Sequence, residues 1–351
     1  MHNLVEQSAI QDSATVEDVS LEMWQEFVAS HPDSTIFHHP RWIELLIEQY
    51  GFRLQIPAIK RDGRILAAIP FLETKNLRGE RKLVSLPFTD YVQPLAMEQQ
   101  ALEDLCVALR TVPKPKVESV VIRGDAPIRG VDTDSQNVRH ELCTSRPLCE
   151  IEASFADSLK RNLRKTRARQ LQFQRSTDES AMETFYRLHV MTRQKLGVPV
   201  QPKSFFRRLS EQVLQRGFGF VGVVTKENEP IAAAVFLTYN NRMIYKYAAS
   251  HSNALEHRPN DCLVHNGIRL ATEEGFKWFD FGISSKQQQG LCRFKRKWGA
   301  TESDVYYNYV TGTVQQTLEN SRAARLASLA IRFGPKFVCR SLGEVFYRFS
   351  Q

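Results

Sequence analysis

The chain has 351 residues, of which 42% are hydrophobic and 25% are charged, and its formal net charge is +8. These proportions exclude a broadly disordered chain and indicate about two globular domains. No apolar run approaches the ~20 residues of a membrane-spanning helix, and residues 1–20 lack the basic start and apolar stretch of a signal peptide. We therefore expect a cytoplasmic protein.

The cysteine and histidine patterns predict neither a disulfide framework nor a metal site. The six cysteines are scattered without a CxxC pair, which is typical of reduced thiols. The nine histidines form no HExxH motif, and the adjacent His38 and His39 would face different ways on any regular element. We expect no bound metal and no permanently bound cofactor.

The first half of the chain predicts a mixed α/β domain at residues 21–153, after a poorly ordered leader at 1–20. The Arg61-Asp62-Gly63 sequence is a hairpin signal between two strands. Hydrophobic spacing predicts the following elements: helices over 21–30 and 40–49, strands over 52–60, 65–72 and 82–86, a helix over 101–110, and a strand over 117–123.

A basic segment opens the second half of the chain, which we assign to a second domain at residues 154–312. Residues 158–175 hold seven bases and no acid. They predict a helix, either with a solvated basic face or with a phosphate-contacting role at the domain junction. The remaining pattern predicts helices over 180–196, 203–216 and 263–274, and strands over 218–225, 231–239, 242–250, 277–282 and 300–310.

Positive charge is concentrated in the C-terminal tail, residues 313–351. Residues 322–351 carry six bases and one acid, whereas the other 321 residues carry 41 bases and 38 acids. Apolar residues at helical spacing accompany these bases, with an interruption at Gly334-Pro335. The tail is compatible with peripheral contact to an anionic inner membrane. The preferred interpretation is a helix pair packed on the second domain.

The stretch from Arg258 to Ala300 holds the candidate chemistry. Pro259 with Asn260 suits the start of a helix, where free N–H groups favour an anion or a carbonyl oxygen, and Arg258 adds positive charge. Asp280 ends a buried apolar strand. Such a carboxylate either caps the following turn or acts as a general base.

Lys295 lies in a basic segment that Phe294 and Trp298, four residues apart, would anchor by burial. A lysine fixed in a cleft stabilises the oxyanion of a tetrahedral intermediate, which is a large catalytic contribution. The alternative is a solvated basic face.

Three motifs in this stretch resemble the second domain of FemAB-related transferases, within the GNAT acyltransferase superfamily. They are R-P-N-D-x-L, F-D-F-G and G-L-x-R-F-K-R-K-W-G-A. The segments N-L-R-K-T-R-A-R, F-H-H-P-R-W and S-L-P-F-T-D-Y resemble further family stretches, so the resemblance covers about residues 35–310. It implies a mixed α+β fold of two tandem GNAT-like domains, followed by the basic helical tail, with the acceptor in the cleft between the domains.

The resemblance also implies transfer of an acyl or aminoacyl group to an amine. Classical members extend the peptide of a peptidoglycan precursor from aminoacyl-tRNA, and many relatives belong to exopolysaccharide synthesis. The ordinary GNAT acetyl-CoA loop, Q/R-x-x-G-x-G/A, is missing here. Acyl-CoA and aminoacyl-tRNA therefore both stay open as donors. The acceptor would be a small-molecule or lipid-linked glycan or a peptidoglycan precursor.

The residues expected to act follow from this resemblance and from the pattern above. Lys295 and Asp280 are the expected catalytic residues. The expected substrate-binding residues are Arg164 and Lys165, which the resemblance associates with precursor phosphates, together with Asp90, Tyr91, Arg258, Asn260 and Arg293. The alternative function is a catalytically inactive GNAT-like protein that binds a phosphorylated glycan lipid or RNA.

Overall fold

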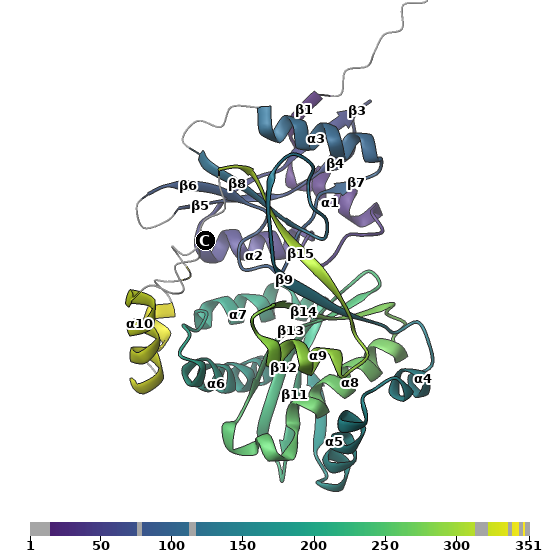
Figure 1. Ribbon diagram of the computed structural model, residues 1–351, viewed down its shortest axis with the longest axis vertical. Helices are drawn as coiled ribbons and strands as arrows, with labels where there is room; N and C mark the ends of the chain where they lie inside the picture. Colours follow the sequence, from purple (N-terminus) through teal and green to yellow (C-terminus); the bar gives the residue numbers. More distant parts are fainter. Residues whose placement is uncertain are drawn as a thin grey trace, which may run out of the picture.

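The computed structural model describes residues 15–75, 79–111, 117–312, 322–335, 339–343 and 347. Two lobes lie one above the other in Figure 1, and one sheet of eleven strands runs through both. Its strand order is β10-β11-β12-β13-β14-β9-β15-β8-β6-β5-β2. A second sheet of four strands, in the order β1-β3-β4-β7, belongs to the first lobe.

The first lobe begins inside the expected leader, because residues 15–18 form a strand that pairs with β3. The hairpin signal is confirmed: Asp62 and Gly63 both have positive φ, 51° and 74°, as a type I′ turn requires. The elements are β1 (Thr15–Asp18), α1 (Leu21–Ser30), α2 (Pro40–Tyr50), β2 (Arg53–Gln55), β3 (Pro57–Arg61), β4 (Arg64–Ala68), β5 (Phe71–Lys75), β6 (Arg81–Val84), β7 (Leu95–Ala96), α3 (Gln99–Thr111) and β8 (Val117–Gly124).

The single strands expected over 52–60 and over 65–72 are each broken in two. β2 pairs with β5 in the large sheet, whereas β3 pairs with β4 in the small one. The chain changes sheets at Ile56 and again between Ala68 and Phe71. Pro70 lies at the second break, and a proline has no N–H to donate to a strand ladder.

The second lobe contains the expected helices and strands in their order, but the helices expected over 158–175 and 203–216 both end early, and the short elements at 148–153 and 172–176 were not predicted. The basic helix ends at Ala168 because Gln170 adopts a left-handed φ of 54°, and the chain continues as an edge strand. The elements are α4 (Leu148–Ala153), α5 (Asp157–Ala168), β10 (Gln172–Ser176), α6 (Glu179–Leu196), α7 (Lys203–Gln212), β11 (Gly219–Lys226), β12 (Glu229–Tyr239), β13 (Arg242–Ser250), α8 (Pro259–Glu273), β14 (Trp278–Ser285) and α9 (Gln289–Arg296), with short 3-10 helices at Leu214–Arg216 and Ser252–His257.

Two long strands, β9 (Asp132–Cys143) and β15 (Thr301–Thr311), join the lobes (Figure 1). β9 pairs with β14 of the second lobe and with β15, and β15 also pairs with β8 of the first lobe. β9 was not predicted, because most of its sequence, D-T-D-S-Q-N-V-R-H-E-L-C, is polar. Its pairing sets Glu141 opposite Asp280.

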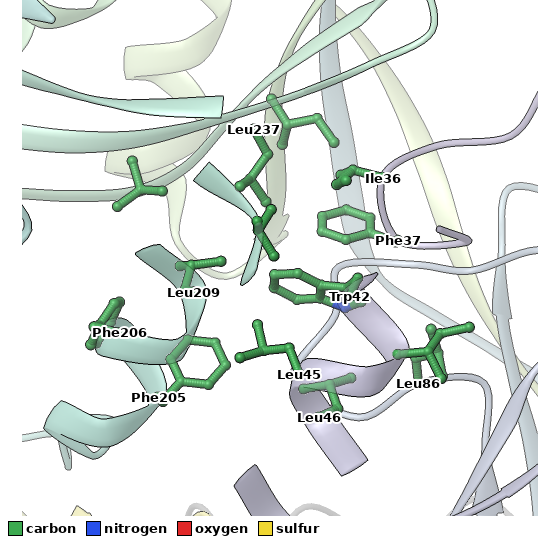
Figure 2. Close-up of a cluster of buried hydrophobic side chains, with 14 of the residues drawn as sticks. Ile36, Phe37, Trp42, Leu45, Leu46, Leu86, Phe205, Phe206, Leu209 and Leu237 are labelled. Atoms are coloured by element: carbon green, nitrogen blue, oxygen red, sulfur yellow. The ribbon is translucent and has the colours of Figure 1, made fainter. Parts of the chain in front are cut away.

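An apolar core also connects the lobes, through α2 and α7. Figure 2 shows Trp42 and Leu45 of α2 facing Phe205 and Leu209 of α7, and all four side chains are buried. The rings of Trp42 and Phe205 meet edge to face, with centroids 6.4 Å apart. The two lobes are therefore packed as one body around the residues between them.

The described part of the tail packs on the second lobe, as the preferred interpretation predicts. Helix α10 (Arg322–Phe333) lies against α6, and Ile331 is buried there. The amide of Gln194 donates to the carbonyl of Gly334 at 2.7 Å. Among the described residues, no helix has the length and apolarity needed to cross a membrane.

Candidate active site

The candidate site begins where β13 and β14 stop pairing. Their parallel ladder covers only Arg242–Ile244 and Trp278–Asp280, and the register of β14 with β9 is irregular between Asp280 and Ile283. Gly282 has a φ of 67°, which favours glycine. The bulge leaves the carbonyls of Gly282 and Ile283 free of the β13 ladder and available to a side chain.

Lys295 of α9 donates hydrogen bonds to these two carbonyls. Its Nζ donates to the carbonyl of Gly282 at 2.8 Å and to that of Ile283 at 3.0 Å. Burial lowers the pKa of Lys295 to about 8, against the raising effect of the Asp90 and Asp280 charges. An ammonium has three N–H groups, so one is left to meet a reacting oxygen. The buried ring of Trp298 anchors the end of the helix against Phe155.

Asp280 lies beside this lysine and already accepts three hydrogen bonds. Its Oδ1 accepts from the amide of Gly282 at 2.7 Å, and its Oδ2 accepts from the Tyr91 hydroxyl at 3.3 Å and from Arg242 at 3.2 Å. Burial raises the pKa of Tyr91, so its hydroxyl keeps the proton that it donates. The contact with Gly282 is the turn-capping role that the sequence allowed.

Three charged residues that sequence reasoning missed complete this network. Glu141 of β9 accepts from Arg242 and, at 2.8 Å, forms an ion pair with Arg139. The guanidinium of Arg139 lies over the ring of Tyr91, 4.9 Å from its centroid. Two carboxylates and two guanidinium groups thus balance one another, which is what buried charges require. The only sign of these residues in the sequence is that each is a charged residue within a strand, β9 for Glu141 and Arg139 and β13 for Arg242.

The first lobe contributes Asp90 to the site. Its Oδ1 lies 2.8 Å from Nζ of Lys246 on β13. A Cβ atom built on Gly282 would lie 3.0 Å from Oδ2 of Asp90. The Asp90 carboxylate therefore sits between the separating strands β13 and β14. Lys246 is a further residue that sequence reasoning missed.

The structure groups only part of the expected site. Lys295, Asp280, Asp90 and Tyr91 come together between the lobes. Arg164 and Lys165 are exposed on α5, which packs on α8 at the end of the second lobe away from the first, rather than at the junction (Figure 1). Two other expected residues, Arg258 and Arg293, are also exposed, at the start of α8 and on α9.

The start of α8 does not offer an open row of amide donors. Pro259 has no N–H, and the amides of Asp261 and Cys262 both donate to the carbonyl of Arg258. The buried carboxylate of Asp261 accepts from Lys297 at 2.7 Å and from Asn162 at 2.9 Å. A carboxylate in the first turn already satisfies the positive end of the helix dipole. This helix start is poorly suited to a pyrophosphate.

Beside this helix start, a hollow of about 160 Å³ lies between α6 and the end of β13. Thr192, Lys195 and Ser250 contribute to its lining. The amide of Asn260 reaches Ser250 Oγ at 3.4 Å, whereas its buried Oδ1 has no hydrogen-bond partner. Asn260 is thus near a hollow of mixed lining, and is separate from the group around Lys295.

One group of described residues has the types and proximity of metal ligands: His140, Cys292 and Glu302, whose ligand atoms all lie within 4.8 Å of one another. Glu302 already pairs with Arg296 at 3.1 Å. Burial, aided by the Lys295 charge, lowers the pKa of His140. Two neighbouring cations oppose the binding of a further cation, so we assign no metal to this group.

Comparison with known proteins shows which domain family and which folds this chain resembles. Residues 153–296 match the family model described as acetyltransferase (GNAT) domain. The fold is similar to that of FemX, with a TM-score of 0.65 at 16% identity, over 84% of this chain and 97% of that one. It is also similar to L-PGS from Bacillus licheniformis, with a TM-score of 0.51 at 12% identity, over 87% and 98% of the two chains.

A tandem GNAT protein from the clavulanic acid biosynthesis pathway aligns with a TM-score of 0.51 at 8% identity, over 86% of this chain and all of that one. A search of the curated proteins finds no match. The fold is therefore two tandem GNAT-like domains, as expected. Residues 153–296 are therefore a GNAT acetyltransferase domain, and the chain as a whole shares the fold of FemX.

Proposed function

We propose that the chain transfers an acyl or aminoacyl group to an amino group of a cell-envelope precursor, either a glycan or a peptidoglycan intermediate. The observation that carries this proposal is the buried Lys295, whose ammonium donates to two carbonyls and has a third N–H for a reacting oxygen. The resemblance of the motifs and the fold shared with FemX support the substrate class.

In the proposed reaction, the acceptor amine attacks the carbonyl carbon of the donor. The C–N bond forms, the carbonyl oxygen becomes an oxyanion, and its collapse breaks the bond to the leaving thiol or ribose oxygen. The Lys295 ammonium would stabilise the oxyanion, a contribution worth about 10²–10³ in rate for a single donor. The amine loses one proton, which a carboxylate accepts and passes to the leaving group or to solvent.

Two carboxylates are candidates for that proton. Asp280 was the first candidate from sequence, but both of its oxygens already accept hydrogen bonds. Asp90 has one oxygen bound to Lys246, and its second oxygen faces Gly282. We therefore propose Asp90 as the base and Asp280 as the residue that positions Tyr91 and the Gly282 turn.

The donor that the site supports better is aminoacyl-tRNA. The start of α8 lacks a glycine loop and carries a buried carboxylate, so it is poorly suited to the pyrophosphate of an acyl-CoA. The exposed bases of α5, including Arg164 and Lys165, suit a long phosphate backbone that extends past the site. Both donors are made in the cytoplasm, where we place the reaction, with a lipid-linked acceptor at the inner membrane.

The experiment is a transfer assay with both donor classes on the wild type, Lys295→Met and the control Lys286→Met. Lys286 is half-exposed and pairs with Asp304 at 2.7 Å, outside the site. We expect Lys295→Met to reduce turnover by about 10²-fold or more, with an unchanged circular dichroism spectrum, and Lys286→Met to retain activity.

Undiminished turnover in Lys295→Met would contradict the assignment. The alternative function, an inactive protein that binds a phosphorylated glycan lipid or RNA, predicts binding without product for the wild type as well. The same assay therefore separates the two functions.

A further inference from the structure

Helix α10 packs on α6 and buries Ile331, but a second apolar face of the helix is exposed to solvent. Leu326, Leu329 and Phe333 are 67%, 52% and 80% exposed. With the exposed Ala330 they occupy positions i, i+3, i+4 and i+7, which is one face of a helix. Ile331, on the opposite side, is buried against α6. A contiguous exposed apolar face of this kind marks an interaction surface.

The helix is held in this orientation by contacts on its other side. Gly197, at the end of α6, has no room for a side chain beside Ser328. The amide of Gln194 donates to Gly334 at 2.7 Å. The apolar face therefore cannot be buried by a small rotation of α10 without the loss of these contacts.

The charge of the tail sequence indicates what would cover the exposed face. Residues 322–351 carry six bases and one acid, and Arg332, next to Phe333, is exposed. A basic helix with an apolar face matches an anionic lipid surface, where the apolar side chains enter the acyl region and the bases stay at the headgroups. A second copy of the chain would bring two basic tails together, which like-charge repulsion opposes.

We propose that the exposed face of α10 docks this enzyme on the surface of an anionic bilayer. Leu329 and Phe333 are the main apolar anchors, and the bases of the tail supply the preference for anionic lipid. This surface is separate from the group around Lys295, so the inference does not depend on the identity of the acceptor.

The test is co-sedimentation of the full-length chain with vesicles of phosphatidylcholine alone and of phosphatidylcholine mixed with phosphatidylglycerol. We expect binding to the anionic vesicles that weakens with salt, and little binding to the neutral ones. The double variant Leu329→Ser/Phe333→Ser should bind at least about tenfold more weakly. Its matched control, Met97→Ser/Val107→Ser, removes two side chains that are 58% and 49% exposed on the first lobe, and should bind like the wild type.

All four positions are exposed, so each variant should keep the wild-type melting temperature, which confirms folding. Equal binding by Leu329→Ser/Phe333→Ser and by the wild type would overturn the proposal, as would equal binding to neutral and anionic vesicles. Light scattering measures the oligomeric state of the wild type and of the double variant, and so tests whether a second copy covers the face. A wild-type dimer that becomes monomeric in this double variant would assign the face to a second copy instead.

Discussion

Asp90 of the first lobe and Lys246 of β13 form an ion pair across the boundary between the lobes, with Oδ1 2.8 Å from Nζ. The Lys246 side chain is only 4% exposed. Its ammonium also lies over the rings of Phe37 and Trp42, with distances of 4.9 and 5.9 Å to their centroids. The pair thus links the strand that borders the site to the loop and helix of the other lobe.

We expect Asp90→Asn to lower the free energy of unfolding by about 3 kcal/mol, because a buried ammonium would lose its counter-charge. The measurement is denaturant unfolding. The control is Glu183→Gln, which removes the partner of Lys203 in a pair whose side chains are 55% and 64% exposed. That change should cost less than about 1 kcal/mol. Equal losses of unfolding free energy in the two variants would show that the buried pair stabilises the fold no more than an exposed pair does.

Gly282→Ala tests whether the space beside Asp90 matters for catalysis. Its φ of 67° makes any side chain unfavourable, by about 1 kcal/mol. The new Cβ would also lie 3.0 Å from Oδ2 of Asp90. We expect turnover to fall about tenfold or more, because small displacements of reacting groups are costly.

Gly275→Ala is the matched control for this change. Gly275 has a φ of 76°, and a Cβ there would meet nothing within 4 Å. Both variants should lose about the same stability, about 1 kcal/mol, in thermal unfolding. Only Gly282→Ala should lose activity, and a similar loss in both would attribute the effect to backbone strain alone.

The sequence predicted most elements of the second lobe because they depend on local patterns. The strand expected over 242–250 matches β13, Arg242–Ser250. Lys295 and Asp280 could also be predicted as site residues, because each lies in a motif that is continuous in the chain. The resemblance of the S-L-P-F-T-D-Y segment added Asp90 and Tyr91, which the structure brings to the same place.

The missing parts depend on contacts between distant residues. β9 is polar in sequence, yet it is central in the sheet because β14 and β15 pair with both of its edges. Its Glu141 and Arg139 gain their roles only through that pairing. The prediction that α5 lies at the domain junction was wrong for the same reason. A helix that is next to a domain boundary in sequence can pack at either end of the domain.

Asp280→Asn distinguishes a positioning residue from a general base. An asparagine keeps an acceptor for the Gly282 amide but loses the charge that faces Arg242, which still has Glu141 as a partner. We expect turnover to fall about tenfold, with the acidic limb of the pH–rate profile retained. The control Asp304→Asn, at a half-exposed residue paired with Lys286, should leave both unchanged. Loss of the acidic limb in Asp280→Asn would make Asp280 the base.

The lowered pKa of Lys295, about 8 instead of 10.5, predicts opposite effects of pH on activity and on stability. Stabilisation of an oxyanion needs the charged ammonium, so turnover should fall as pH rises through about 8. Between this pH and 10.5 the unfolded chain holds a proton that the folded chain has released.

Unfolding then takes up a proton, so the stability that this lysine contributes rises with pH across that window. The check is the free energy of unfolding of the wild type minus that of Lys295→Met, measured at about pH 7 and about pH 9.5. This difference should increase at the higher pH while the turnover of the wild type decreases. A pH-independent difference, together with full turnover above about pH 9, would mean that Lys295 keeps an ordinary pKa and that its burial does not tune the reaction.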